Sequence, residues 1–261
     1  MLKKYPILIF FVLSYVFSWI FWLPLLMINL ETTPYAILFI LIGGFGPLIS
    51  AWFISKKLGY WNDLKQSMFK LKNSLKWYLS ALLLPFAILL LSYGIFLVLG
   101  GKPEFSESMP SFYMYPLLLL FVMVLGGGLE EPGWRGFALP MLLKKYNLFS
   151  ASILIGLLWG LWHLPLFFIP GSSQFNLPFQ WYLPNAFALS IIFSWLYIKS
   201  KKNIWLAIIL HGGINASFTF YPGMNSIETS FGALSFYAPI TLSTSIIAIL
   251  LITSYRKIFF E

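Results

Sequence analysis

Long apolar segments alternate with short polar connections along the whole chain. A membrane-spanning helix needs about 20 mostly apolar residues, and eight segments reach or approach that length. They cover residues 6–29, 34–55, 77–100, 113–143, 148–169, 181–198, 203–220 and 235–255. The pattern predicts an all-α fold, a polytopic membrane bundle of about eight transmembrane helices.

The fourth apolar segment, 113–143, is too long for one straight span. At ~1.5 Å per residue it would reach roughly 46 Å, more than the ~30 Å thickness of the hydrocarbon core. We therefore expect it to tilt strongly or to break near the Gly126–Gly128 run and Pro132. A broken helix at membrane depth is tolerated where it faces protein or a wet cavity, so we expect such a cavity here.

Basic residues gather in alternate connections. Of the 17 lysines and arginines, all but Lys102 and Arg135 fall on one predicted side, whereas Glu31, Glu104, Glu107 and Glu228 fall on the other. Cytoplasmic connections carry the excess of Lys and Arg in membrane proteins. Eight spans with N- and C-termini in the cytoplasm satisfy this alternation. The basic side is thereby predicted to face anionic lipids, and no nucleic-acid partner is needed to explain it.

Composition agrees with an integral membrane protein and narrows its chemistry. Hydrophobic residues make up 59% and charged residues 10% of the chain, and the net charge is +9. Cysteine is absent, which excludes disulfides, thiolate metal sites and cysteine nucleophiles. The first apolar run is longer than a signal-peptide core and lacks an obvious cleavage site, so we interpret it as a retained span. No linker divides residues 1–261, and a single integral membrane domain is predicted.

The connection 56–76 is the only sizeable cytoplasmic one. Its Leu64, Met68, Leu71 and Leu75 recur at helical spacing with lysines between them. That pattern predicts a helix lying in an anionic membrane interface. A topological anchor is the simpler interpretation, and substrate docking is the alternative.

Ionisable side chains inside apolar segments are the candidate functional residues. Glu130, Glu131, Arg135, His163 and His211 all lie in such segments, where each charge costs roughly 3 kcal/mol or more unless it is paired or hydrated. Glu131 and Arg135 are four residues apart and can pair on a helix. Glu130 points roughly 100° away and is left as the less compensated carboxylate, suited to accept and return a proton.

The two histidines are each accompanied by a second polar or aromatic residue. Trp159 and His163 share a helical face one turn apart, and so do His211 and Asn215. An imidazole and an amide presented together can hydrogen-bond a developing oxyanion, while Glu130 and His163 can position and deprotonate a water. The alternatives are structural: the Glu131–Arg135 pair and Asn215 could hold helices together, and Trp159 could serve packing.

Three ordered motifs resemble a known family. Glu130 to Arg135 resembles EExxxR, Trp159 to His163 resembles FxxxH with Trp in place of Phe, and His211 to Asn215 resembles HxxxN. Together they are similar to the CPBP family, the CAAX-processing and bacteriocin-processing intramembrane proteases also called Abi proteins, over a motif-bearing core of 113–220.

The resemblance implies an intramembrane endopeptidase, in a bacterial cytoplasmic membrane, acting on a peptide or a membrane-associated protein. It implies that Glu130 with His163 activates water and that His211 and Asn215 stabilise the oxyanion. Glu131, Arg135 and Trp159 would be supporting residues.

Metal use and two rival functions stay open at this point. Glu130, His163 and His211 are a ligand set found in some catalytic zinc sites, but Arg135 beside the carboxylates and Asn215 beside His211 favour a mechanism without a cofactor. A proton-coupled transporter would also place Glu and His at mid-depth. A non-catalytic bacteriocin-immunity or partner-binding protein is the other alternative.

Overall fold

The computed structural model describes residues 2–28, 30, 33–103, 109–221, 227–229 and 232–261. Within these residues the chain is helical except for one antiparallel hairpin, β1 (Ile227–Thr229) with β2 (Gly232–Leu234). The longer helices are α1 (Pro6–Trp22), α2 (Ile37–Gly44), α3 (Gly46–Leu58), α4 (Trp61–Met68), α5 (Leu75–Val98), α6 (Tyr115–Leu125), α9 (Leu148–Trp162), α10 (Phe179–Lys199), α11 (Ile204–Phe218) and α12 (Tyr237–Ser254).

Seven helical segments in the described part of the chain are long and apolar enough to cross a membrane. They correspond to seven of the eight predicted spans, and the protein is an integral, multi-pass membrane protein. The eighth, α11, has only 15 residues. At ~1.5 Å per residue it reaches about 22 Å, so seven of the about eight predicted spans are confirmed in length and the remaining one is a shorter apolar helix.

The short helix α11 lies inside the bundle. It packs against α5, α6 and α10, which separate most of its surface from lipid. Asn203 caps its N-terminus by accepting a hydrogen bond from the amide of Leu206 at 3.2 Å, and Asn147 caps α9 in the same way from Ser150 at 2.8 Å. Capping of this kind satisfies amides that have no intrahelical partner, and it fixes where both motif-bearing helices begin.

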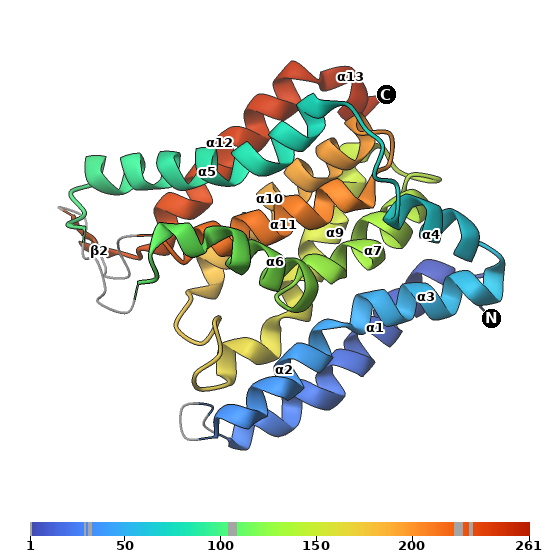
Figure 1. Cartoon of the computed structure of the whole chain (residues 1–261), viewed down its shortest axis with the longest axis horizontal. Helices are drawn as coiled ribbons and strands as arrows, with labels where there is room; N and C mark the ends of the chain where they lie inside the picture. Colours follow the sequence, from blue (N-terminus) through green and yellow to red (C-terminus); the bar gives the residue numbers. More distant parts are fainter. Residues whose placement is uncertain (1, 29, 31–32, 104–108, 222–226, 230–231) are drawn as a thin grey trace.

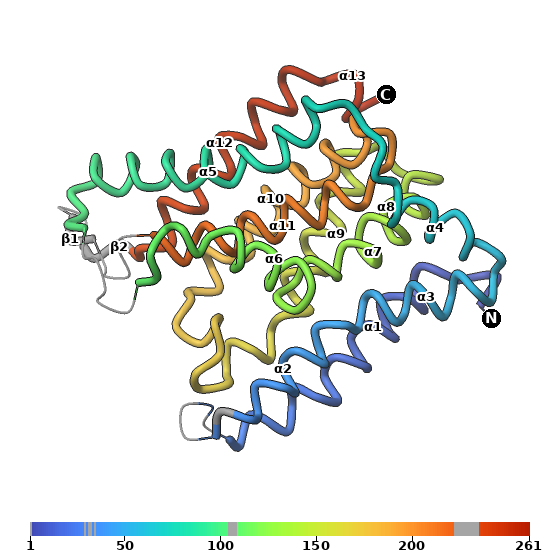
Figure 2. The backbone as a smooth tube through the Cα atoms, viewed as in Figure 1, coloured from blue at the N-terminus to red at the C-terminus, as the bar shows by residue number. Residues whose placement is uncertain are grey.

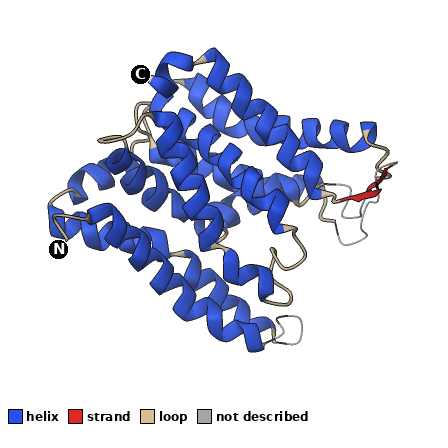
Figure 3. Ribbon diagram, turned by 180° about the vertical axis from the view of Figure 1, so that it is seen from behind, coloured by secondary structure: helices blue, strands red, loops and turns tan. Residues whose placement is uncertain are grey.

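Three groups of helices make up the bundle. Figure 1 shows α1 with α2 and α3 along one side, α9, α10 and α11 in the middle, and α5 with α12 on the opposite side. The tube in Figure 2 shows that α6 and α7 (Glu131–Gly133) lie between the first group and the middle one. The view from behind in Figure 3 shows the hairpin at one end of the molecule.

Both chain termini lie at the end opposite the hairpin. Figure 1 shows the N-terminus, the C-terminus and α4 together there. Lys56 and Lys57 are in the last turn of α3, at this same end. The predicted alternation requires both termini and the basic connection 56–76 to lie on one side, and they lie at one end of the structure. That this end faces the cytoplasm stays a prediction. Glu31, Glu104 and Glu107 lie outside the described residues.

The predicted amphipathic helix in the connection 56–76 is present but shorter than expected. It is α4, which contains Leu64 and Met68 and ends before Leu71. Leu64 is buried, whereas Leu71 and Leu75 are 60% and 70% exposed. The helix ends because the residues after Met68 form hydrogen bonds with the turn that follows α10 instead, and Asn203 donates to the carbonyl of Lys70 at 2.7 Å.

Candidate active site

The fourth apolar segment breaks at the glycine run, as predicted. The helix α6 ends at Leu125, and Gly127 has a φ of 113°, a conformation that glycine adopts without strain. The chain then continues through short helical turns, of which α7 begins at Glu131 and a π-helical turn covers Trp134–Ala138. Pro132 is not itself a break, because it lies in the first turn of α7 where its missing N–H costs nothing.

Gly127 also brings two functional side chains to one place. A Cβ atom at this position would lie 2.7 Å from Nε2 of His211 and 3.2 Å from Oε1 of Glu130. Both atoms therefore lie close to the glycine backbone and on the same side of it. A side chain at this position would collide with the imidazole.

Glu130 is held by two indole groups. Its Oε2 accepts hydrogen bonds from Nε1 of Trp134 at 3.1 Å and from Nε1 of Trp159 at 2.7 Å, and the residue is 5% exposed. Among the residues that the structure describes, its carboxylate has no cationic nitrogen within 4.0 Å. Oε2 is thus fixed in place, and Oε1 is directed toward Gly127.

Glu131 is paired in a different direction. Its Oε2 lies 3.2 Å from Nη1 of Arg135, the i, i+4 pair that the spacing predicted, and its Oε1 lies 2.8 Å from Nδ1 of His211. Arg135 is fully buried, with its guanidinium 4.6 Å from the ring centre of Phe193. Within the described part of the chain, its Nε and Nη2 have no hydrogen-bond partner. Glu131 is therefore its main compensation.

His163 is oriented by its own helix. Its Nδ1 is 2.8 Å from the carbonyl oxygen of Trp159. Because a carbonyl can only accept, Nδ1 carries the hydrogen and Nε2 has a free lone pair in the neutral ring. The ring of Trp159 lies edge-on to both imidazoles, with centroid distances of 5.7 Å to His163 and 5.6 Å to His211.

Asn215 joins α11 to the broken segment. Its Nδ2 donates to the carbonyl of Gly126 at 3.0 Å, and its side chain is exposed. Together with the contact between His211 and Glu131, this bond ties two successive turns of α11 to the residues on either side of Gly127. One hydrogen of the Asn215 amide is used in this way, and the second is left for another acceptor.

The predicted site residues come together, and others join them. The sequence analysis did not single out Trp134, although its distance of four residues from Glu130 is the helical spacing at which side chains meet. Tyr182, whose ring lies 5.7 Å from that of His163, carried no recognisable signal. Trp159 contributes polar contacts to Glu130 and His163 as well as packing.

The predicted zinc alternative does not fit this arrangement. In the described ranges, no three His, Cys, Asp and Glu side chains are placed to hold a metal ion. Oε2 of Glu130 is occupied by two indole donors, and the Glu131 carboxylate is paired with Arg135 and His211. The reaction proposed for the site therefore uses protein side chains alone.

The sequence matches the profile of one protein family and is similar to two named proteins. Residues 112–217 match the profile of the family described as type II CAAX prenyl endopeptidase Rce1-like. The chain is 36% identical over 229 residues to CAAX prenyl protease 2 of Methanococcus maripaludis, covering 81% of this chain and 83% of that protein. It is 26% identical over 182 residues to lysostaphin resistance protein A of Staphylococcus haemolyticus, covering 67% of this chain and 45% of that protein.

Proposed function

This chain belongs to the Rce1-like type II CAAX prenyl endopeptidases, and on that premise we propose that it hydrolyses a peptide bond of a membrane-associated protein or peptide with Glu130 activating the water. The observation that carries the proposal is that Oε1 of Glu130 and Nε2 of His211 approach the same point beside Gly127. A water bound between these two atoms would contact the base directly. The two indole bonds on Oε2 restrict rotation of the carboxylate, so Oε1 stays directed at that water.

The hydrogen-bond partners of the two imidazoles favour different roles for them. His163 donates through Nδ1 to a carbonyl, so its Nε2 is an acceptor that can take a hydrogen bond from the water. His211 has Nδ1 on the Glu131 carboxylate, which orients its ring with Nε2 toward Gly127. When both ring nitrogens carry hydrogen, Nε2–H is a donor, as an oxyanion site requires.

The proposed reaction needs one proton acceptor and two oxyanion donors. Glu130 takes a proton from the water as its oxygen attacks the scissile carbonyl, and the C–N bond then breaks as the same proton is returned to the leaving amine. Nε2–H of His211 and the second amide hydrogen of Asn215 would stabilise the tetrahedral oxyanion. Arg135 and Glu131 are positioning residues, since they act through His211.

The first test is cleavage of a prenylated CAAX peptide by the purified full chain in lipid nanodiscs, with Glu130→Gln as the variant. The substitution preserves shape and hydrogen bonding, so we expect the protein to fold and cleavage to fall by about 10²–10⁴-fold, the usual contribution of a general base. Undiminished cleavage by the variant would rule out Glu130 as the base.

Two further measurements address the substrate and the metal. The membrane peptidomes of wild-type and Glu130→Gln cells should differ by an accumulating precursor, which would identify the natural substrate whether or not it is prenylated. Cleavage should persist in a tight chelator. Loss of activity in the chelator and its return with zinc would contradict the metal-free mechanism.

The same variant separates the rival functions. A non-catalytic immunity protein would protect cells equally well with Gln at position 130, and a proton-coupled transporter would show pH-driven flux in liposomes without cleavage. Membership of an endopeptidase family supports neither rival. An intact peptidome in the variant together with full protection would nevertheless favour the immunity function.

A further inference from the structure

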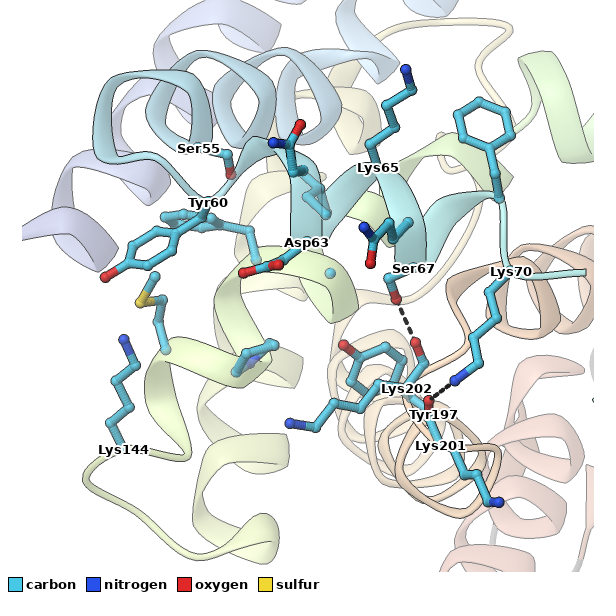
Figure 4. Close-up of a pocket in the computed structure, with 18 residues that line it drawn as sticks. Ser55, Tyr60, Asp63, Lys65, Ser67, Lys70, Lys144, Tyr197, Lys201 and Lys202 are labelled. Atoms are coloured by element: carbon cyan, nitrogen blue, oxygen red, sulfur yellow. Dashed lines mark hydrogen bonds between the residues drawn. The ribbon is translucent and has the colours of Figure 1, made fainter.

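A second cavity lies away from the candidate active site, at the end of the molecule that carries the termini and α4. Its volume is about 1160 Å³, and Figure 4 shows the side chains that line it. The walls come from four parts of the chain: the end of α3, the helix α4, the residues from Gly136 to Lys144, and the end of α10 with the turn after it. We call it the basic cleft.

The basic cleft has a strong excess of positive charge. Its lining contains Lys65, Lys70, Lys144, Lys201 and Lys202, and the only acidic residue in it is Asp63. Among the residues described, none of these lysines has a carboxylate within 4.0 Å. The excess positive charge surrounds a hollow, and this favours a bound anion.

The lysines are held in place by a network of bonds to the turn after α10. Lys201 and Lys202 both have a φ of 59°, a left-handed conformation that is unfavourable for residues with a Cβ. The turn is fixed by Ser67, which donates to the carbonyl of Lys202, and by Nζ of Lys70, which donates to the carbonyl of Lys201 at 2.8 Å. Lysine therefore occupies two positions where glycine or asparagine would adopt the backbone conformation with less strain.

Two of the lysines face each other across the hollow. Figure 4 shows Lys144 and Lys202 on opposite walls with Asp63 between them, whereas Lys65 extends away. Serine, asparagine, glutamine and tyrosine side chains also line the cleft and supply neutral donors, beside apolar residues such as Phe137 and Met141. A phosphate group, with several acceptor oxygens, matches two ammonium groups and neutral donors of this kind.

The place of the cleft in the fold identifies the source of the phosphate. The helix α4 connects the end of α3 to the start of α5, so the cleft lies where two membrane spans end. Phe69, in the lining of the cleft, is 67% exposed, and Leu71 and Leu75, which follow it in the chain, are 60% and 70% exposed, as expected of side chains that contact acyl chains. We infer that the basic cleft binds the phosphate head group of an anionic phospholipid from the adjoining leaflet.

The test is a titration of the full chain in neutral detergent with phosphatidylglycerol, followed by native mass spectrometry, with phosphatidylcholine for comparison. Each lysine near an anionic head group contributes about fivefold in affinity, so Lys144→Gln with Lys202→Gln should weaken phosphatidylglycerol binding by about 25-fold. The matched control is Lys145→Gln with Lys257→Gln, which removes the same charge from exposed positions outside the cleft. It should bind within about twofold of wild type.

Three outcomes would overturn the inference. Equal losses of phosphatidylglycerol affinity in the two double variants would mean general attraction to a charged surface. Displacement of the lipid by equimolar glycerol phosphate would mean that the ligand is a soluble phosphate. Tighter binding of an acidic peptide than of the lipid would mean that the partner is a protein. Because the double variant could misfold, Lys202→Gly provides a second measurement. It removes one charge and also relieves the left-handed strain, and we expect it to fold and to bind about fivefold more weakly.

Discussion

The two neighbouring carboxylates should respond differently to the same substitution, Glu131 by a loss of stability and Glu130 by a loss of cleavage. Glu131→Gln removes the negative charge nearest to Arg135, whose guanidinium is fully buried and has only this residue as its ion-pair partner in the described part of the chain. Breaking a buried pair by removing one partner costs about 3–5 kcal/mol. The bond from His211 to Glu131 at 2.8 Å is weakened as well, so the loss should fall in the upper part of that range.

Glu130→Gln is the matched control for this loss of stability. Glu130 has no ion pair among the described residues, and a glutamine oxygen still accepts an indole hydrogen bond. We therefore expect the free energy of unfolding to change by only about 1 kcal/mol. The two variants differ by one position in the chain and remove the same charge, so any difference in stability reflects the partners of each side chain.

Thermal unfolding in nanodiscs, followed by tryptophan fluorescence, measures the difference. At roughly 2–4 °C per kcal/mol for a protein of this size, the upper part of that range, about 4–5 kcal/mol, means that Glu131→Gln should lower Tm by about 8–20 °C, and Glu130→Gln by less than about 4 °C. Cleavage of the prenylated peptide should be lost in Glu130→Gln well below its Tm. An unchanged Tm for Glu131→Gln would refute the reasoning, because it would show that Arg135 is compensated without Glu131.

Two further predictions concern Gly127 and the two tryptophans that contact Glu130, the proposed base. Gly127→Ala would place a Cβ 2.7 Å from a histidine nitrogen of the site and should abolish cleavage. The matched control is Gly59→Ala, because Gly59 also has a positive φ but a Cβ there has nothing within 4 Å; this variant should cleave at the wild-type rate. Equal effects of the two substitutions would mean that backbone strain alone is responsible. Trp134→Phe and Trp159→Phe should each reduce cleavage about tenfold, the effect of one hydrogen bond to a charged group. The double variant should lose more than the product of the two, because no donor then fixes Oε2 of Glu130, and strict additivity would contradict a shared role.

The membrane-spanning helices could be predicted from hydrophobic length, and the shorter helix could not. Seven of the eight apolar segments form helices long enough to cross a membrane. The segment 203–220 is equally apolar, but its helix is limited to Ile204–Phe218. Apolar composition does not distinguish a helix surrounded by lipid from one surrounded by other helices, and α11 is of the second kind.

The pairings within one helix were also predictable, whereas those between helices were not. The i, i+4 rule gives the contact of Glu131 with Arg135, and applied to Glu130 it would have given the one with Trp134. The contact of Trp159 with Glu130, at 2.7 Å, depends on how α9 packs beside the broken segment. The sequence also indicated that the helix breaks near the glycines. It did not indicate which glycine has the positive φ that directs the following turn; that glycine is Gly127, and its conformation depends on the packing.

The different surroundings of Glu130 and Glu131 explain why both carboxylates are present. The roughly 100° between adjacent residues on a helix turns Glu131 toward α11, where Arg135 and His211 compensate its charge. It turns Glu130 toward Trp159 of α9, whose neutral indole group, together with that of Trp134 in the same segment as Glu130, is its hydrogen-bond donor. A buried carboxylate without a cation is costly, and a purely structural role would be served as well by a glutamine. An ionisable group at Glu130 is therefore best explained by a proton that it accepts and returns.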